Sequence, residues 1–161
     1  MEVNFSDIGS YVYAACACQH TAATAAGTGD NAYIDGVIFD LEALPFRPTS
    51  AVLVATYEAV LDEDETLTLK SKVEDDTDSG LATAAAYSYD GAESAGVVVA
   101  TGDTGGSTEI GAYKRSIDLR GIRRYFRISV HQDLSASGTD TNQLMAGVLF
   151  FAGEAVQADS E

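Results

Sequence analysis

Apolar and polar residues alternate with a period of two in short runs along most of the chain, which is the pattern of β-strands that bury one face. Clusters of Gly, Asp, Asn, Ser and Thr separate these runs and are typical of turns. The pattern predicts about eight strands, over residues 11–18, 32–41, 51–61, 66–74, 95–102, 112–119, 123–132 and 143–151. Short strands at this spacing predict an all-β fold, a single-domain antiparallel β-sandwich that is jelly-roll-like.

Two neighbouring runs carry further expectations about burial and pairing. Residues 51–61 are apolar or small in both alternating sets, which predicts a central strand covered on both faces. In residues 66–74 the leucines and the valine face inward, while Thr and Lys alternate outward. The acidic run 62–65 lies between the two and predicts a hairpin tip, so that the second strand pairs with its predecessor.

The chain divides into three parts by composition. Residues 1–26 are expected to form an extended N-terminal arm or first strand, residues 27–152 the sandwich, and residues 153–161 a polar tail. The segment 81–94 is either a short helix or an irregular excursion. The N-terminus is acidic and lacks the apolar core of a secretion signal, and no apolar run approaches the ~20 residues that span a bilayer. We therefore expect synthesis in the cytosol, with any export by a route other than secretion.

The charge balance narrows the classes of partner. The chain holds 25 acidic and 9 basic residues, for a formal net charge of −16. Such a chain is repelled by the phosphates of nucleic acid and by anionic membranes, so neither is an expected partner. The balance suits a protein that stays soluble at high concentration, or one that faces solvent on a larger assembly.

Two cysteines lie close together, Cys16 and Cys18, with His20 nearby. On a regular strand these side chains point to one face, beside Ala14. A metal site needs a second pair or further histidines at ligand spacing, so we interpret the cysteines as small thiols that are buried or lie at an interface, and we expect no metal.

The glycine-rich and acidic segments are best explained as turns. Segments 27–31 and 102–108 lack the lysine and the helix start of a phosphate-binding loop. Asp76 and Asp78 resemble the start of a calcium loop, but the position that would supply the closing glutamate is Tyr87. Solvated acidic loops are therefore the expectation, with weak calcium binding as the alternative.

No catalytic arrangement stands out. The two histidines, His20 and His131, lie in different predicted strands, and neither has an obvious nucleophile beside it. His131, at the polar end of its strand, is expected to be a hydrogen-bonded surface residue. We expect a protein that is not an enzyme, with no catalytic residue and no cofactor.

A basic cluster stands out against the acidic background. Its candidate interface residues are Arg115, Arg120, Arg123, Arg124, Tyr125 and Arg127. If the two strands that flank it pair, the cations share one region of a sheet. One interpretation is ion pairing with acids of the same domain. The other is an intersubunit or docking contact, because guanidinium forks suit buried carboxylates. The residues alone leave both open.

The segment "VVVATGDTGGSTEIGAYKRSIDLRGIRRYFRISVHQDLSASGTDT", residues 97–141, followed by an apolar closing strand, resembles small virion structural proteins of tailed bacteriophages. The likeness is looser over residues 27–76. The resemblance implies a capsid decoration (cement) protein on the surface of the virion, made in the host cytoplasm. It implies the major capsid protein as partner, and self-association as a homo-oligomer, with a trimer favoured.

Two alternatives accompany this expectation. A head–tail connector or tail component would fit the same setting. A ligand-binding or calcium-binding β-module, with the acidic loops holding carbohydrate or calcium, belongs to another class.

Overall fold

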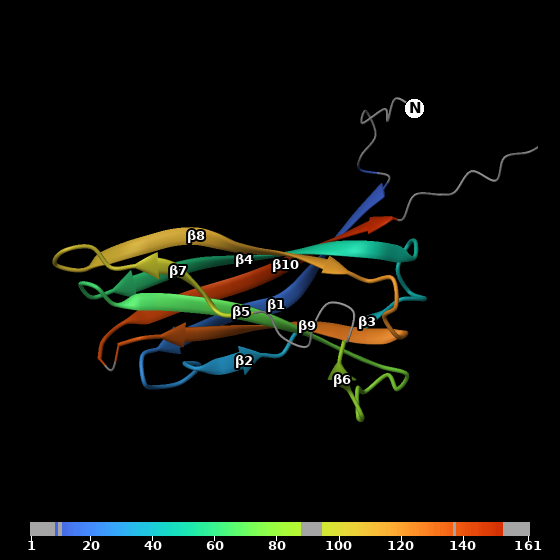
Figure 1. Ribbon diagram of the computed structural model, residues 1–161, viewed down its shortest axis with the longest axis horizontal. Coiled ribbons are helices and arrows are strands. Elements are labelled where there is room, and N and C mark those ends of the chain that lie inside the picture. The colour runs from blue at the N-terminus through green and yellow to red at the C-terminus, as the bar shows by residue number, and fades with distance from the viewer. Residues whose placement is uncertain (1–8, 10, 88–94, 137, 153–161) are drawn as a thin grey trace, which may run out of the picture.

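A computed structural model describes residues 9, 11–87, 95–136 and 138–152 of the 161-residue chain. Ten strands form two antiparallel sheets that face each other (Figure 1). The four-stranded sheet has the order β1-β10-β4-β8, and the six-stranded sheet has the order β2-β9-β5-β6, with β3 paired to β9 and β7 paired to β5. The strands are β1 Val12–Thr24, β2 Ala32–Ile34, β3 Phe39–Asp40, β4 Pro48–Leu61, β5 Thr66–Asp76, β6 Ala85–Ala86, β7 Val97–Thr101, β8 Ser107–Asp118, β9 Tyr125–Leu134 and β10 Thr141–Ala152.

The strand order is that of a jelly roll. β2 and β3 pair with successive parts of β9, and together they fill one position in the sheet. β6 and β7 likewise share the other side of β5. With these merged, eight positions remain, and their order is 1-8-3-6 in one sheet and 2-7-4-5 in the other. The predicted fold class, an antiparallel jelly-roll sandwich, is confirmed.

One expected strand pairing is wrong, and a second pairing that was considered does not occur. β4 pairs with β10 and β8, whereas β5 pairs with β9, so the acidic run 62–65 crosses from one sheet to the other and is not a hairpin tip. β8 and β9, which flank the basic cluster, also lie in different sheets. Period-two alternation reveals which side chains share a face, but it carries no information about the partner strand.

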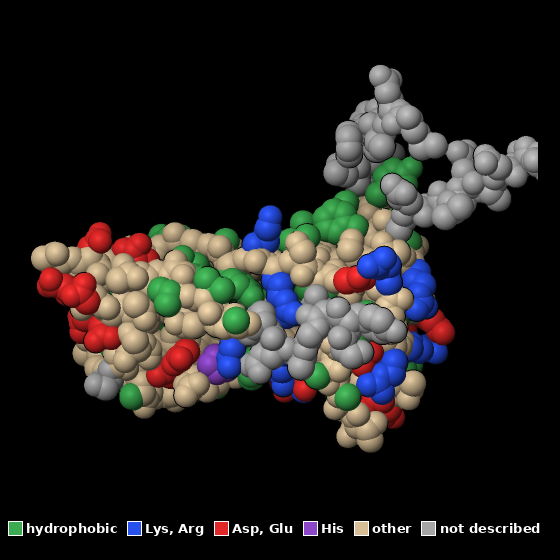
Figure 2. Space-filling view, in the orientation of Figure 1, with side chains coloured by type: hydrophobic (Ala, Val, Ile, Leu, Met, Phe, Trp, Pro, Cys, Tyr) green, Lys and Arg blue, Asp and Glu red, His purple; other side chains and the backbone are tan. Residues whose placement is uncertain are grey.

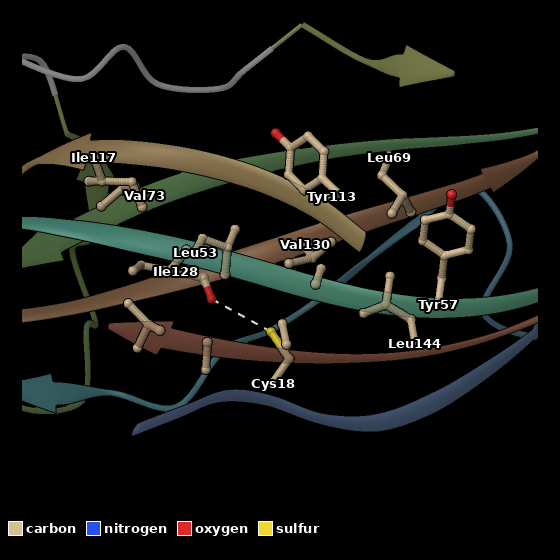
Figure 3. Close-up of a cluster of buried hydrophobic side chains, with 14 of the residues drawn as sticks. Cys18, Leu53, Tyr57, Leu69, Val73, Tyr113, Ile117, Ile128, Val130 and Leu144 are labelled. Carbon is tan, nitrogen blue, oxygen red and sulfur yellow. Dashed lines mark hydrogen bonds between the residues drawn. The ribbon is translucent and has the colours of Figure 1, made fainter. Parts of the chain in front are cut away.

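The core fills the space between the sheets, as Figure 3 shows. Leu53 of β4, Leu69 of β5 and Ile128 of β9 are completely buried. The Cys18 thiol donates to the Ile128 carbonyl oxygen at 3.6 Å, which links β1 to the opposite sheet. Phe39, Phe126 and Phe150 meet at one end of this core, with ring centroids 5.0–5.9 Å apart.

β4 buries one face, and the expectation that both faces are covered is wrong for this chain. Leu53, Ala55 and Tyr57 are buried, but Val54 is only partly covered and Thr56 is exposed. No element of the described chain packs over that side in Figure 1. In β5 the inward set is confirmed, and Ser71 joins Leu67, Leu69 and Val73 in the interior.

β1 extends beyond the predicted end at residue 18, because two irregularities interrupt the alternation there while the strand continues to Thr24. Its register against β10 shifts between Cys16 and Cys18, and again between Cys18 and Thr21. An extra residue in a strand flips the faces that follow it. Cys16 is therefore exposed and Cys18 buried, which corrects the expectation that both point to one face.

The segment 81–94, for which a short helix or an irregular excursion was expected, begins with turns and the short strand β6. This strand pairs with Glu74 and Asp75 of β5. Residues 88–94 of that segment, most of residues 1–10, and the tail 153–161 lie outside the described residues. Among the described residues, no helix has the length and apolar character that crossing a membrane requires.

Candidate functional site

The two ends of the sandwich differ in charge. At the acidic end lie the loops 25–31, 62–65, 102–106 and 135–140. At the arginine end lie β3 and the connection 119–124, close to the start of β1 and the end of β10. Figure 2 shows acidic side chains without Lys or Arg at the first end, and Lys and Arg with acidic side chains among them over the rest of the molecule.

At the arginine end, Arg123 binds the buried carboxylate of Asp75. Its Nε and Nη2 atoms lie 2.9 and 2.8 Å from Asp75 Oδ1, and its backbone N–H donates to Asp75 Oδ2 at 2.8 Å. The Asp75 side chain is only 5% exposed. Because this carboxylate has almost no access to water, the guanidinium and the N–H supply the solvation that it lost on folding. This contact ties the β8–β9 connection to the end of β5.

Arg124 binds the carboxylate at the end of β3. Its Nε and Nη2 atoms each lie 2.9 Å from an oxygen of Asp40, a two-point fork, and its Nη1 lies 2.6 Å from Glu42. The fork lowers the pKa of Asp40 below its ordinary value and raises that of Arg124. The guanidinium also lies 4.9 Å from the ring centroid of Tyr125.

Arg127 lies on the outer side of β9 and bridges two elements. Its Nε donates to Glu74 of β5 at 2.9 Å, and its Nη1 contacts Asp35 at 3.0 Å. Lys72 contacts the same Glu74 at 3.1 Å. Burial opposes ionisation of Glu74, but the hydrogen bonds from Arg127 and Lys72 outweigh it and hold the pKa of Glu74 below its ordinary value.

The remaining two arginines of the cluster, Arg120 and Arg115, differ in their surroundings. Arg120 binds Asp118 two residues away, and hydrogen bonds from its side chain and backbone lower the pKa of Asp118 to about 2. Arg115 points inward from β8 and crosses to β5, where it donates to the backbone oxygen of Ser71 at 2.9 Å. The structure therefore brings Arg120, Arg123, Arg124 and Arg127 to one end of the molecule and places Arg115 between the sheets.

The basic cluster therefore has acidic partners within its own chain. Each of Arg120, Arg123, Arg124 and Arg127 forms an ion pair with an acid of this domain. The side chains of Arg120 and Arg124 nevertheless stay 77% and 44% exposed. A contact between these arginines, or Tyr125, and another subunit stays a prediction.

The acidic end consists of loops that hydrogen bonds join and that contain no basic side chain. Gly102 accepts from the Asp64 N–H at 3.1 Å and donates to the Glu65 oxygen at 2.9 Å, which joins the loops 62–65 and 102–106. The four loops contain no Lys or Arg. Their acids are Asp30, Asp62, Glu63, Asp64, Glu65, Asp103 and Asp140. Negative charge at this end is therefore balanced by backbone N–H groups and solvent.

Asp140 is the buried member of the acidic end. It is 2% exposed, and its Oδ1 accepts from the Asp62 N–H at 3.1 Å. Its Oδ2 is buried without a hydrogen-bond partner among the described residues. Burial, with the nearby charges of Asp62 and Glu65, raises the pKa of Asp140 above its ordinary value.

The second acidic loop, which resembles a calcium loop in sequence, is closed by its own hydrogen bonds. Asp76 Oδ1 accepts from the Thr77 N–H at 2.7 Å, and Oδ2 accepts from the Thr83 N–H and hydroxyl at 2.8 and 2.9 Å. Asp78 accepts from Gly80 N–H at 2.9 Å. Within the described ranges, no group of three or more His, Cys, Asp or Glu side chains is arranged to hold a metal ion.

Each of the two histidines contacts a side chain on a neighbouring strand. His20 Nε2 lies 2.9 Å from Gln143 Oε1, across the β1–β10 pair. His131 is 7% exposed and meets the Tyr33 ring edge-on, with centroids 4.9 Å apart. The expectation of a surface position for His131 is wrong, because β2 and its aromatic side chain cover that part of β9.

The outer face of the four-stranded sheet is an exposed surface that the sequence pattern does not predict. We define this outer face as the even-numbered residues 50–60 of β4 and 108–118 of β8, the odd-numbered residues 141–151 of β10, and Ala14 and Cys16 of β1. Ile110 is 77% exposed and Met145 53% exposed on it. The sequence signal for this surface is the apolar character of both alternating sets in β4, which predicts burial but does not reveal whether this chain or another molecule covers the face.

Comparison with known proteins gives a likeness of fold alone. No protein-family model matches the chain, and no curated protein matches it. A crystal structure of the VP2 subviral particle of infectious bursal disease virus aligns with a TM-score of 0.40 and 12% identity, covering 88% of this chain and 32% of that chain. The T13 particle of the same virus gives a TM-score of 0.42 and 10% identity, covering 88% and 31%. The chain spans about a third of the length of these structures. Similarity at this level does not assign a function.

Proposed function

We propose that this chain is a non-enzymatic structural protein of a tailed-phage virion, and that it decorates and stabilises the outside of the head. Two features support the class. The jelly roll is an architecture that viral capsid domains use, although lectins and cupins use it as well. The sequence over residues 97–141 resembles small virion proteins of tailed phages.

The observation that carries the proposal is the division of charge between the two ends. The acidic end holds seven carboxylates and no cation in its loops, and such a surface repels other acidic surfaces and favours contact with solvent. At the arginine end, Arg120, Arg123, Arg124 and Arg127 form ion pairs with seven carboxylates and offset part of their negative charge. We infer that the arginine end faces the capsid and the acidic end faces outward.

The exposed parts of Arg120 and Arg124 are the groups that suit a docking contact. A guanidinium offers five N–H donors, and the intrachain fork of Arg124 to Asp40 uses only part of them. In this proposal the major capsid protein supplies further acceptors. Self-association, with a trimer favoured, would multiply each weak contact by avidity.

The test uses phage heads that lack this protein. Purified chain is mixed with such heads, bound chain is measured after sedimentation, and the temperature at which the heads release DNA is recorded. We expect saturable binding, a higher release temperature, and weaker binding for the Arg120→Ala, Arg124→Ala double variant. A matched variant at the acidic end, Glu63→Gln with Asp64→Asn, should bind as the wild type does.

Three outcomes separate the alternatives. Chain that binds neither heads nor tails, and leaves the release temperature unchanged, contradicts the proposal. Binding to connectors or tails instead of heads identifies the alternative virion location. A rise in melting temperature on calcium titration of the isolated chain, without head binding, identifies the calcium-binding module.

A further inference from the structure

The outer face of the four-stranded sheet carries several exposed apolar side chains, and about half of its residues are apolar. Ile110 and Met145 are 77% and 53% exposed, and Val60 is 47% exposed. A shallow hollow on this face is lined by the apolar Ile110 and Met145 and by the polar His20, Thr56, Glu58 and Gln143. Contiguous apolar surface of this kind on a soluble chain marks a contact with another molecule more often than it marks free surface.

The net charge of the outer face is only −1, from two acids and one lysine. Its charged residues are Glu58, Lys114 and Asp118, in a chain that holds 34 charged residues. Asp118 is paired with Arg120 at the rim. Two copies of a −16 chain repel each other at most of their surfaces, so a nearly uncharged face is where two copies can approach.

The two remaining charges have opposite signs and no ion-pair partner within the described residues. Glu58 lies opposite Ile110 and Lys114 lies opposite Val54, so the two are displaced by four residues along neighbouring strands. Their Cα atoms are therefore about 14 Å apart, from a rise of about 3.4 Å per residue and a strand spacing of about 4.8 Å. At that separation they cannot pair with each other in one chain.

The positions of these two charges are self-complementary. The point midway between them lies over Thr56 and Ala112, which face each other across β4 and β8 and have small side chains. A two-fold axis that lies in the plane of the face, passes over this pair and runs perpendicular to the line from Glu58 to Lys114 exchanges the positions of these two residues. Such an axis places Glu58 of one copy on Lys114 of the other, twice, with the small side chains of Thr56 and Ala112 at the centre.

We propose that the outer face of the four-stranded sheet binds the same face of a second copy of this chain about a two-fold axis. The apolar side chains supply the contact area, and the two reciprocal Glu58–Lys114 pairs fix its register. The inference goes beyond the decoration function and does not rest on it, because the contact is measurable on the isolated chain without any capsid.

The test is a charge reversal, read by sedimentation equilibrium over the full soluble concentration range. We expect the wild type to dimerise through this face, a two-fold contact separate from the trimer favoured on the head. Glu58→Lys and Lys114→Glu should each weaken the dimer about tenfold or more, because each creates two like-charge contacts. The double variant, Glu58→Lys with Lys114→Glu, should restore the wild-type affinity. Glu63→Lys makes the same change of charge at the acidic end and should not weaken the dimer.

Cys16 offers a second, independent measurement, because its exposed thiol lies on the outer face. Its rate of alkylation should fall as the chain concentration rises through the dimer dissociation constant. Thermal melting of each variant confirms that folding is retained. A wild type that stays monomeric with a constant Cys16 rate overturns the proposal. A double variant that fails to regain dimerisation also overturns it, since the contact would then belong to a different geometry or partner.

Discussion

Arg123 holds the buried carboxylate of Asp75 with its side chain and its own backbone N–H, through contacts of 2.8 and 2.9 Å. This three-point contact joins the β8–β9 connection to β5. It also gives the basic cluster a structural role inside the chain, whatever further contacts its exposed members make.

Replacement of Arg123 by Ala should destabilise the isolated chain. It leaves Asp75 buried with a single N–H donor, and we expect a loss of about 2–4 kcal/mol in the free energy of unfolding. The matched control is Arg120→Ala, which breaks a solvent-exposed pair with Asp118 and should cost much less than Arg123→Ala. Urea unfolding of both variants measures the difference. Equal losses for the two would contradict the structural role of Arg123.

The pH dependence of stability should reveal the buried Asp140. Its pKa is raised above the ordinary 3.8 in the folded chain, mainly by burial. As pH rises above 3.8, the unfolded chain releases this proton before the folded chain does, so the contribution of Asp140 to stability falls until the folded pKa is passed. Asp140→Asn should therefore match the wild type near pH 3 and become more stable than it toward neutral pH. Urea unfolding as a function of pH gives the difference.

A control separates burial from the general effect of net charge. Asp103→Asn removes one negative charge from an exposed position of the same end. We expect its stability difference from the wild type to vary less with pH than that of Asp140→Asn. If the two differences follow the same curve, the burial of Asp140 does not explain the effect.

The two thiols should differ in reactivity. Cys16 is exposed, whereas burial raises the pKa of Cys18 to about 11. Thiolate is the reactive form, so at pH 8 the native monomer should react with a disulfide reagent at one thiol, and the denatured chain at two. Cys16→Ser should abolish the native reaction, and Cys18→Ser should leave it intact. Two fast thiols in the native wild type would contradict the bulge that separates their faces.

Gly36 should tolerate no side chain. A Cβ atom there would collide with the Ile128 carbonyl oxygen and lie 3.1 Å from the Ala17 oxygen, where the β2–β3 connection passes close to the backbone of both sheets. We expect Gly36→Ala to lower the free energy of unfolding by about 1–3 kcal/mol. Gly138→Ala is the matched control, since nothing lies within 4 Å of its added Cβ. Thermal denaturation compares the two, and equal melting temperatures would argue against the close approach.

Much of the local structure was predictable from alternation alone. Leu67, Leu69 and Val73 of β5, and Phe126, Ile128 and Val130 of β9, face the core as their spacing predicts. Such residues share a face because successive side chains in a strand point to opposite sides. The same rule failed at Cys18, because a bulge inserts a residue without any mark in the sequence.

The candidate site was predictable in its members but not in its partners. The arginines between 115 and 127 are evident from the sequence as a basic cluster, and so is the acidic run 62–65. Asp40, Glu74 and Asp75, which bind the arginines, come from elements about 50 to 85 residues away. No local pattern connects such distant positions, because many carboxylates in this chain are chemically equivalent candidates.

The sequence by itself determined that the chain is an all-β sandwich, where most of its strands lie, which side chains face inward, and that its charge is strongly negative. These properties follow from period-two alternation and from composition, which are local or additive. Only the tertiary structure decided that β4 and β5 join different sheets, that the arginines bind this chain's own acids, and that the outer face of the four-stranded sheet is uncovered. Each of these depends on hydrogen bonds and packing between segments far apart in the chain, and the alternating pattern is compatible with many such arrangements.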